Sequence, residues 1–297
     1  MNYSIGIDLG GSSVKAVAVA HTGALLGKHN ETFEPERPMH FAETIRSLVE
    51  RIRTERGQKP DCIGVSAPGL AAKDGQSIAF MPGRLRGLEG LNWSKYLETS
   101  FEIPVLNDAQ AALVGEVWRG AAQGCQNVIL ITLGTGVGGA AMVDGHLLRG
   151  NSGKAGHLGH STVDINGPPD VCNIPGSLEV AIGNCTLPAR SNGRFANTHE
   201  LVAAHLAGDS RATEVWLKSV RALACAIGSF TNILDPEVCV IGGGIARAGA
   251  ALFEPLKRMV PELEWKTADS GVRIVPAELG ELSGAFGAAR HALNFER

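Results

Sequence analysis

The chain of 297 residues is longer than a single hydrophobic core usually organises, which predicts two domains. Hydrophobic residues make up 44% of the sequence and charged residues 19%, as in globular proteins, and no apolar run reaches the length of a membrane span. A net charge of −3, the lack of a basic run and an aromatic content of 5% argue against a nucleic-acid partner.

The six cysteines form no CxxC pair and follow no regular spacing, and Cys239 lies in the apolar run EVCVIGG. Cysteine in such a run acts as a small core residue. No signal peptide is recognisable before the first predicted strand. We therefore expect a cytoplasmic protein with reduced thiols.

The first predicted element is a β-hairpin over Tyr3 to Val19, YSIGIDLGGSSVKAVAV. Its apolar first strand ends at Asp8, and Gly10 and Gly11 lie in the turn, where backbone without Cβ atoms can bring N–H groups close to an anion. A carboxylate repels a bare phosphate but attracts a phosphate that carries a metal ion. The hairpin therefore predicts a site for phosphate and Mg²⁺, and the alternative is an ordinary tight turn.

The rest of the first half alternates between strands and helices, which predicts an α/β layer. We expect a helix over Phe41 to Arg53, a strand over Cys62 to Gly69, a polar segment from Lys73 to Gly90, a short helix around Trp93 to Thr99, a strand over Ile103 to Leu106 and a helix over AQAALVGEV. Asn107-Asp108 lies at the last strand-to-helix junction. Asp108 at such a position is either a helix N-cap or an exposed catalytic carboxylate.

A second hairpin is predicted over Val128 to Val143, VILITLGTGVGGAAMV, and it repeats the design of the first. Its glycines match GxGxxG, but the residues that follow alternate as a strand, whereas the dinucleotide fingerprint requires a helix there. A phosphate cradle at a hairpin tip remains consistent, with Thr135 adding a hydroxyl donor. Two hairpins of one design predict a duplicated fold facing a shared cleft.

The remaining chain contains an irregular segment and then helices and strands. We expect irregular structure from Arg149 to Asn197, helices over Thr213 to Leu234, Ala250 to Met259 and Ser283 to Phe295, and strands over Val238 to Ile241 and Val272 to Val275. Gly242-Gly243-Gly244 follows a strand, and it indicates either close approach of a nucleotide base or ribose, or a plain turn.

His157 and His160 are spaced i, i+3, with Asp170, Cys172 and Cys185 downstream. Structural zinc prefers a closed tetrahedral set of histidines and cysteines, and no compact cysteine cluster is present. A polar pocket or an exposed loop explains these histidines more simply than a zinc site.

Together these stretches resemble the ROK family of sugar kinases, glucokinase-like members of the actin-like ATPase superfamily. The resemblance covers nearly the whole chain and is specific in IGIDLGGSSVKAVAV, LITLGTGVGGAAMVDGHLLRG, VLNDAQAALVGE and ILDPEVCVIGGGIA. It implies an α/β fold of two ribonuclease-H-like domains around a central cleft. The implied domains are a smaller one over residues 1–113, joined by a C-terminal helix over 283–297, and a larger one over 114–282.

The resemblance also implies the roles of individual residues. Asp108 would be the general base, and Asp8 and Asp108 would bind Mg²⁺ through water or the ATP phosphates. The implied nucleotide and phosphate contacts are Asp8, Gly10, Gly11, Ser12, Lys15, Gly134, Thr135, Gly136, Gly243 and Gly244. The implied sugar contacts are Gly69, Asn107, Asp108, His157, His160 and Glu179.

Three departures from the family pattern bear on substrate and metal. The family's Ala-Gly-Glu-x-Gly-His reads AGHLGH here, so His157 takes the position of a glutamate that contacts the sugar. The family's zinc motif CxCGxxGCxE keeps Cys172 but has Asp170 and Ser177 at two cysteine positions, and we therefore predict no structural zinc. The stretch where relatives commonly offer an asparagine to the sugar reads MPGRLRG.

The resemblance implies ATP-dependent phosphorylation of a sugar hydroxyl, by default the C6 hydroxyl of a hexose, with Mg²⁺ as the metal. An N-acetylhexosamine or N-acetylmannosamine kinase is the alternative within the family, and a non-catalytic sugar-binding protein or transcriptional regulator is the alternative from another class. DNA-binding members carry an N-terminal winged-helix module, whereas this chain enters its first strand at once. We expect a small-molecule sugar partner, no nucleic acid and no membrane; relatives are commonly homodimers, so a homodimer stays open here.

Overall fold

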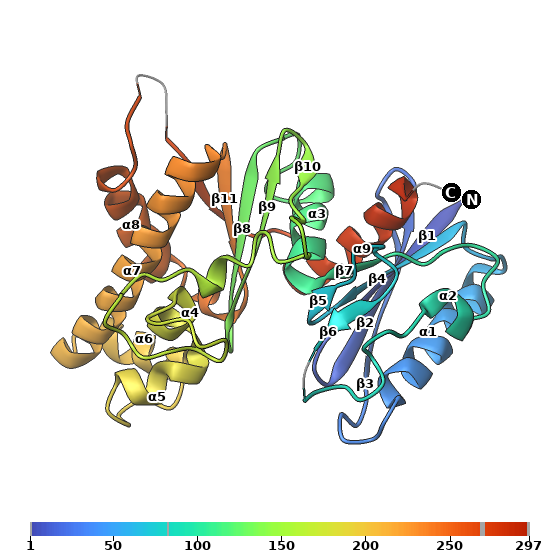
Figure 1. Cartoon of the computed structure of the whole chain (residues 1–297), viewed down its shortest axis with the longest axis horizontal. Helices are drawn as coiled ribbons and strands as arrows, with labels where there is room; N and C mark the ends of the chain where they lie inside the picture. The colour runs from blue at the N-terminus through green and yellow to red at the C-terminus, as the bar shows by residue number, and fades with distance from the viewer. Residues whose placement is uncertain (1, 82, 268–270, 296–297) are drawn as a thin grey trace. The chain divides into compact units, whose positions relative to one another are not determined.

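The computed structural model describes residues 2–81, 83–267 and 271–295. They form two compact α/β units, one made of Met1–Gly124, Arg149–Ala155 and Glu278–Arg297, the other of Cys125–Leu148 and Gly156–Ala277 (Figure 1). The expected boundary between residues 113 and 114 lies inside a continuous helix, α3 (Asp108–Arg119). We therefore propose a two-domain organisation in which each domain corresponds to one of these units.

The first unit is built on a five-stranded sheet in the order β3-β2-β1-β4-β7. These strands are β1 (Tyr3–Leu9), β2 (Ser13–Ala20), β3 (Leu25–Thr32), β4 (Cys62–Ala67) and β7 (Val105–Asn107). The hairpin β1–β2 is antiparallel, as predicted. Strand β4 pairs in parallel with β1, and β7 pairs in parallel with β4. A small two-stranded sheet of β5 (Leu70–Ala71) and β6 (Ile78–Phe80) follows β4.

The second unit repeats this topology in the order β10-β9-β8-β11-β12. Its strands are β8 (Val128–Leu133), β9 (Val137–Val143), β10 (His146–Leu147), β11 (Val238–Gly242) and β12 (Arg273–Pro276). Here too a hairpin, β8–β9, is antiparallel, and β11 and β12 continue the sheet in parallel. The duplication predicted from the two glycine-tipped hairpins is therefore confirmed at the level of topology.

Helix α1 (His40–Arg56) covers one face of the first sheet. Its apolar residues Phe41, Ile45 and Leu48 join Ile5 and Ile7 of β1 in one hydrophobic core, to which the short helix α2 (Trp93–Tyr96) adds Trp93. Burial of such side chains contributes about 1.5–3 kcal/mol each. The helical spacing of these residues predicted this element correctly.

Helices α3 and α9 (Ser283–Asn294) cover the other face of the same sheet (Figure 1). Their close approach depends on glycines. A Cβ on Gly6 of β1 would lie 1.8 Å from the carbonyl oxygen of Ala285, and one on Gly287 would lie 1.7 Å from that of Ala111. Any larger side chain at these positions would push α9 away. The predicted helix over 283–297 thus folds onto the first unit, although residues 296 and 297 lie outside the described part of the chain.

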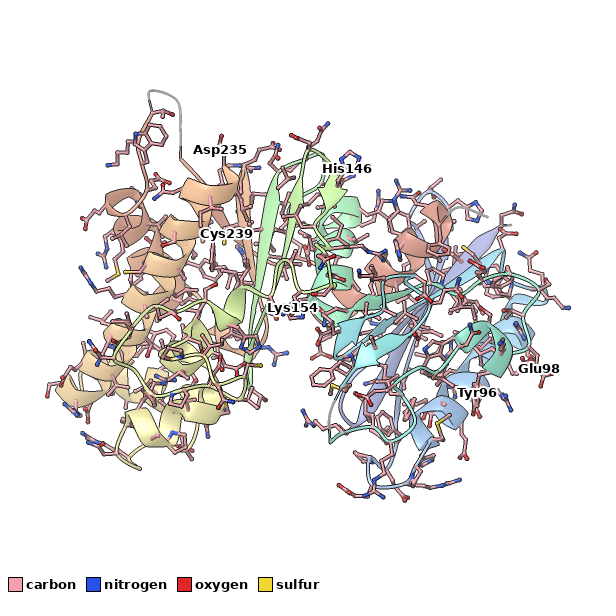
Figure 2. The ribbon with its side chains drawn as sticks, viewed as in Figure 1. Tyr96, Glu98, His146, Lys154, Asp235 and Cys239 are labelled. Atoms are coloured by element: carbon pink, nitrogen blue, oxygen red, sulfur yellow. The ribbon has the colours of Figure 1, made fainter. Side chains whose placement is uncertain are left out.

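The second unit buries its core between its sheet and a group of helices. These helices are α4 (Leu178–Ile182), α5 (Leu187–Arg190), α6 (Thr198–Leu206), α7 (Ser210–Leu234) and α8 (Ala250–Met259). Side chains of β8 and β11, including Ile131 and Ile241, pack with Val220 and Leu223 of α7. Figure 2 shows Asp235, which ends α7 in a left-handed conformation, and Cys239 on β11, whose thiol is buried and has its pKa raised by burial.

The structure adds elements that the sequence did not predict. Strand β3 occupies a stretch with no clear apolar alternation, β6 lies in the segment expected to be polar loop, and α4, α5 and α6 lie in or next to the segment expected to be irregular. Among the described residues, no helix combines the length and apolar composition that crossing a bilayer would require.

Candidate functional site

Three polar side chains of the first unit lie in a row at one edge of its sheet. Asp8 of β1 pairs in register with Lys15 of β2 on one side and with Ser66 of β4 on the other. The Ser66 hydroxyl donates to Asp8 Oδ1 at 2.7 Å. Lys15 Nζ lies 3.5 Å from a carboxylate oxygen of Glu281. The carboxyl ends of parallel strands share one edge of a sheet, so the polar side chains that end these strands lie close together there.

Asp8 is enclosed by its surroundings. A Cβ on Gly284 of α9 would lie 2.6 Å from Asp8 Oδ1, so only glycine fits over the carboxylate. Desolvation raises the pKa of Asp8 to about 6, the bond from Ser66 lowers it, and the charge of Asp108 raises it further. Because desolvation and the charge of Asp108 disfavour the ionised form of Asp8, a cation bound beside it would stabilise that form. Asp8 and Asp108 therefore fit a hard divalent cation such as Mg²⁺.

At the junction of β7 and α3, Asn107 and Asp108 differ in their part in capping the helix. By backbone conformation Asn107 is the N-cap, and its Oδ1 accepts from Ala109 N at 3.0 Å while its Nδ2 donates to Gly69 O at 2.9 Å. Asp108 is the first helical residue, and its Oδ1 shares the same Ala109 N–H at 2.8 Å. Asn107 is 6% exposed, whereas Asp108 is exposed. The main capping role thus falls to Asn107 and leaves the carboxylate of Asp108 at the surface.

The tip of the hairpin β8–β9 in the second unit is fixed by backbone bonds and one carboxylate. Gly134 N donates to Gly136 O at 2.9 Å, and Val137 N donates to Glu179 Oε2 at 2.9 Å. A Cβ on Gly136 would lie 2.3 Å from the same carboxylate oxygen. Glu179, on the first turn of α4, is therefore packed against the tip. This contact joins a predicted sugar residue to a predicted phosphate loop.

A cavity of about 790 Å³ in the second unit brings together residues of both predicted nucleotide motifs. Gly134 and Thr135 line it from the hairpin tip, and Gly244 lines it from the segment after β11. Gly243 does not line it and has φ +86°, with Leu133 O only 2.3 Å from a Cβ placed on it. Two adjacent glycines thus have different reasons to be glycine, one structural and one facing the cavity.

Helix α6 forms a wall of this cavity that sequence reasoning missed. Val202, Ala203 and Leu206 line it, and they offer apolar surface of the kind that receives a flat base. Asn184 holds the wall in place, because its backbone N donates to Gly134 O at 3.0 Å and its Oδ1 accepts from Thr198 N at 2.8 Å. The apolar spacing of ELVAAHL was the signal available for this element.

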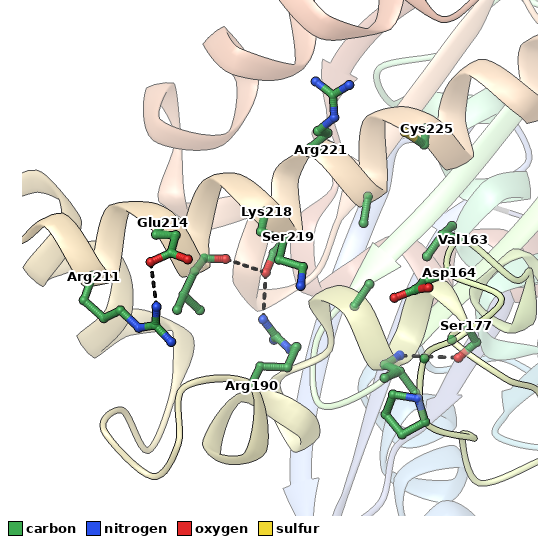
Figure 3. Close-up of a pocket in the computed structure, with 17 residues that line it drawn as sticks. Val163, Asp164, Ser177, Arg190, Arg211, Glu214, Lys218, Ser219, Arg221 and Cys225 are labelled. Atoms are coloured by element: carbon green, nitrogen blue, oxygen red, sulfur yellow. Dashed lines mark hydrogen bonds and ion pairs between the residues drawn. The ribbon is translucent and has the colours of Figure 1, made fainter.

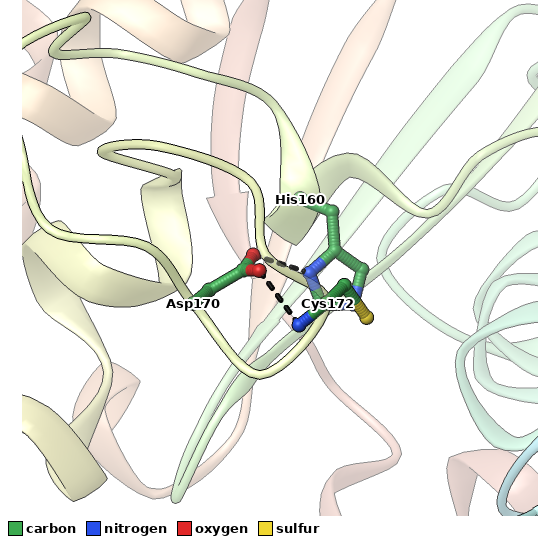
Figure 4. Close-up of side chains that lie close together, drawn as sticks. All are labelled: His160, Asp170 and Cys172. Carbon is green, nitrogen blue, oxygen red and sulfur yellow. Dashed lines mark hydrogen bonds and ion pairs between the residues drawn. The ribbon is translucent and has the colours of Figure 1, made fainter.

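His160, Asp170 and Cys172 form a compact cluster in the segment between β10 and α4 (Figure 4). His160 Nδ1 lies 2.8 Å from Asp170 Oδ2, while Cys172 Sγ lies 3.7 Å from His160 Nε2, on the other side of the ring. One ligand atom from each of the three residues lies within 4.8 Å of the others. The set nevertheless has a single cysteine where the family's zinc motif has three, so it departs from that site in its ligand types. The prediction that no structural zinc binds stays a prediction.

The remaining predicted residues lie in one unit or the other. Gly10 N donates to Ser13 O at 2.8 Å and closes the tip of the first hairpin, where Gly11 and Ser12 are exposed. His157 precedes the short 3₁₀ turn Leu158–His160 in the second unit and is half-buried. The stretch MPGRLRG belongs to the first unit, and its Pro82 lies outside the described residues. The structure thus groups the predicted residues into two sets, one in each unit.

Two polar residues that sequence reasoning did not single out complete the first set. Ser66, described above, occurs in a strand that reads simply as apolar, CIGVSAPG. Glu116 of α3 is fully buried, and its carboxylate accepts from Ala121 N, Glu278 N, Leu279 N and Ser283 Oγ at 2.9–3.1 Å. Glu116 thereby ties α3 to the start of α9, which holds Gly284 over Asp8.

Two α/β units of the same topology, each with a glycine-tipped hairpin, are the fold of the actin-like ATPase superfamily. Residues 4–294 match the family described as "ROK family", and the chain belongs to that family. It is 30% identical to the glucokinase of Thermotoga maritima over 96% of this chain and 95% of that protein. It is 28% identical to an N-acetylmannosamine kinase of Escherichia coli over 98% of both chains.

A solved structure supports the same assignment. The ROK hexokinase of Thermus thermophilus superposes with a TM-score of 0.85 at 30% sequence identity, covering 98% of each chain. The likeness therefore spans both units and the connections between their elements, rather than one shared motif.

Proposed function

We propose that this chain transfers the γ-phosphoryl group of ATP to the C6 hydroxyl of a hexose, with Asp108 as the general base. Membership of the ROK family and likeness to a glucokinase along nearly the whole chain support its class, that of a sugar kinase. The observation that carries the specific proposal is the exposed carboxylate of Asp108 at the carboxyl end of β7, close enough to Asp8 for its charge to raise the pKa of that residue.

Phosphoryl transfer asks for a positioned nucleophile, neutralised phosphate charge and a place for the departing proton. Asp108 accepts the proton of the attacking hydroxyl. Its position is fixed because Asn107 caps α3 and is itself anchored to Gly69 O. A bound Mg²⁺, held by Asp8 and Asp108 directly or through water, would neutralise charge on the phosphates. A positioned base of this kind contributes about 10²–10⁴-fold to the rate.

The nucleotide is assigned to the cavity of about 790 Å³ in the second unit. At the hairpin tip, the N–H groups of Thr135 and Gly136 and the Thr135 hydroxyl contact phosphate oxygens, and Gly134, whose own N–H donates to Gly136 O, allows their close approach. Gly244 allows close approach, and the apolar wall of α6 receives the base. In the first unit, Gly11 and Ser12 are proposed phosphate contacts by the same backbone argument, Gly10 by allowing close approach at the tip, and Lys15 by its side-chain charge.

The sugar is assigned to Asn107, His157, His160 and Glu179, together with Gly69. Histidine at position 157 replaces an acidic acceptor by a ring that can donate, so the hydroxyl or substituent it contacts is expected to differ from that of glucose-specific relatives. This substitution favours one second candidate, the phosphorylation of an N-acetylhexosamine such as N-acetylmannosamine, the substrate named for a relative of similar length.

A coupled assay of ADP release over hexoses and N-acetylhexosamines tests the proposal, with the position of the phosphate read by NMR. Asp108→Asn should keep the wild-type melting temperature and lose about 10²–10⁴-fold in turnover. If Asp108 only supported the cap, Asp108→Asn would keep its turnover, and the loss of about 0.5–2 kcal/mol of stability would appear in Asp108→Ala. That result would refute the assignment of the base.

A second assay separates the kinase from a regulator of the same family. A gel shift with genomic fragments should show no retardation by this chain. A sugar-binding protein without activity would bind a sugar in calorimetry but release no ADP with any member of the panel.

A further inference from the structure

The second unit contains a second cavity, of about 450 Å³, that the proposed reaction does not use (Figure 3). It lies between α7 and the segment that runs from Val163 to Ala181, and Arg190 of α5 also lines it. Part of its wall is apolar, with Val180, Val215 and Ala222 among the lining residues. None of its lining residues belongs to the predicted sugar or nucleotide set.

Basic residues dominate the charges of this cavity. Arg190, Arg211, Lys218 and Arg221 line it, against Asp164 and Glu214. Arg211 is neutralised by Glu214 at 2.6 Å. Within the described ranges, no carboxylate lies within ion-pair distance of Arg190, Lys218 or Arg221. In a chain with a net charge of −3, three uncompensated cations around one cavity indicate a site for an anion.

Arg190 is held rigidly by neutral partners. Its Nε donates to Thr186 Oγ1 at 3.1 Å, one terminal nitrogen donates to Ser219 Oγ at 2.7 Å, and the other donates to Gly183 O at 2.9 Å. Figure 3 shows the guanidinium reaching from α5 to Ser219 on α7. Burial lowers its pKa to about 10. Each terminal nitrogen keeps a second N–H, so the fork can still bind an oxyanion.

The cavity shares helix α4 with the predicted sugar site. Val180 and Ala181 of α4 line the cavity, while Glu179, one residue earlier, accepts from Val137 N at the hairpin tip. At the end of the same helix, Gly183 N donates to Glu179 O at 2.8 Å, and Gly183 O accepts from Arg190. An occupant bound to Arg190 is therefore connected, through Gly183, to the helix that positions Glu179.

We propose that this cavity binds a phosphate monoester of a small metabolite and thereby adjusts the sugar affinity of the enzyme. The phosphate contacts Arg190 and Lys218, and the apolar wall covers the carbon skeleton. The effect on sugar affinity rests on the function proposed above, whereas the binding itself does not.

Calorimetry without nucleotide or sugar tests the binding, with glucose 6-phosphate and inorganic phosphate as separate probes. Lys218→Gln removes an exposed cation of the cavity and should weaken binding by about tenfold, the worth of one charge-assisted bond. Lys257→Gln on α8 is the matched control, because it changes the net charge equally outside the cavity. Stronger binding of the ester than of inorganic phosphate identifies the monoester; equal binding overturns that part and leaves a phosphate site.

These measurements test binding at the cavity independently of whether the chain phosphorylates a sugar. Equal binding in Lys218→Gln and Lys257→Gln, or no binding at millimolar concentration, overturns the proposal even if the chain phosphorylates a sugar. Binding that depends on Lys218 supports the site even if no sugar is phosphorylated. In an active enzyme, the ester should change the KM for sugar in wild type and in Lys257→Gln but not in Lys218→Gln. A change of oligomeric state in Lys218→Gln, without any ligand binding, would mark this face as a contact between copies and also overturn the proposal.

Discussion

Ser66 and Asp8 face each other in register across the parallel pair β1–β4, with the serine hydroxyl 2.7 Å from Asp8 Oδ1. The bond favours the ionised carboxylate, but desolvation and the charge of Asp108 outweigh it and raise the pKa of Asp8 to about 6. The folded protein therefore holds an ionised Asp8 at neutral pH at a cost in free energy. Binding of a cation beside Asp8 removes that cost.

The first prediction concerns stability against pH in the absence of nucleotide and metal. Because the pKa of folded Asp8 lies above its ordinary value of 3.8, this group stabilises the fold below about pH 4, and that contribution is lost as the pH rises through about 6. The loss is on the order of 2–3 kcal/mol, at about 1.4 kcal/mol per pKa unit. Urea unfolding between about pH 4 and 7 should show this fall in stability in wild type and a flatter curve in Asp8→Asn.

The variant is needed because other groups titrate in the same range. Burial lowers the pKa of His291 to about 4, which makes the fold gain stability as the pH rises and partly masks the effect of Asp8. The difference between wild type and Asp8→Asn cancels this contribution. Ser66→Ala should steepen the slope, since it removes the bond that favours the carboxylate. Parallel curves for wild type and Asp8→Asn would contradict the assignment.

The second prediction separates the two adjacent glycines after β11. A Cβ on Gly244 meets no atom within 4 Å, so Gly244→Val should fold normally and place its side chain in the nucleotide cavity. We expect the KM for ATP to rise by about tenfold, the equivalent of about 1.4 kcal/mol, while the KM for sugar stays unchanged. Steady-state kinetics with each substrate varied in turn measures this split.

Gly243→Ala is the contrasting variant. Its φ of +86° and the contact of 2.3 Å with Leu133 O predict strain and overlap, and a loss of about 2–4 kcal/mol in the free energy of unfolding. A Gly243→Ala protein as stable as wild type would contradict the strain assigned to Gly243, and a Gly244→Val protein with an unchanged KM for ATP would place the nucleotide elsewhere.

Much of the fold was predictable from sequence because its signals are local. The hairpins β1–β2 and β8–β9 combine apolar strands with glycine tips, and α1 and α7 carry apolar residues at helical spacing. Strand β3 was missed because it is an edge strand: its residues LLGKHNET are half-buried or exposed, and only pairing with β2 makes them a strand. Short helices such as α4 depend on caps and tertiary contacts rather than on periodicity.

The candidate site divides in the same way. Asp8 lies near the end of a strand, and Asp108 and Gly244 follow strands; such positions are visible in the sequence. Ser66 was not predictable, because its role comes from the register of β1 with β4. Arg190 was not predictable either, since Thr186, Gly183 and Ser219 surround it only after α5 docks against α7.

The third prediction concerns Glu179, which joins α4 to the tip of β8–β9. Glu179→Gln keeps an oxygen that can accept from Val137 N, so the melting temperature should change little. It removes the charge offered to a sugar hydroxyl, and a bond to a charged group is worth about 1.5–3 kcal/mol. The KM for sugar should therefore rise by more than about tenfold, the equivalent of about 1.4 kcal/mol. Glu179→Ala, which also leaves Val137 N without its acceptor, should lose stability as well; equal sugar KM in all three proteins would remove Glu179 from the sugar site.

The fourth prediction concerns the cluster of His160, Asp170 and Cys172. Desolvation raises the pKa of Asp170, but bonds from His160, Ile174 N, Ser177 and Cys172 N outweigh it and hold the pKa below its ordinary value. The side chain of Asp170 is 1% exposed, so these bonds stabilise the loop without a metal. The purified protein should contain no stoichiometric zinc by elemental analysis, and a chelator should leave its melting temperature unchanged.

A gain-of-binding variant makes this last prediction decisive. Asp170→Cys with Ser177→Cys restores cysteines at both altered positions of the family motif, beside Cys172 and His160. Removing Asp170 frees His160 Nδ1, so the ring can turn and all four ligands can converge on one ion with the tetrahedral geometry that zinc prefers. The double variant should bind one zinc per chain and lose melting temperature when a chelator removes it, because metal binding then contributes to folding. Zinc bound at one per chain in the wild type, and lost together with stability on chelation, would show that Asp170 acts as a ligand after all.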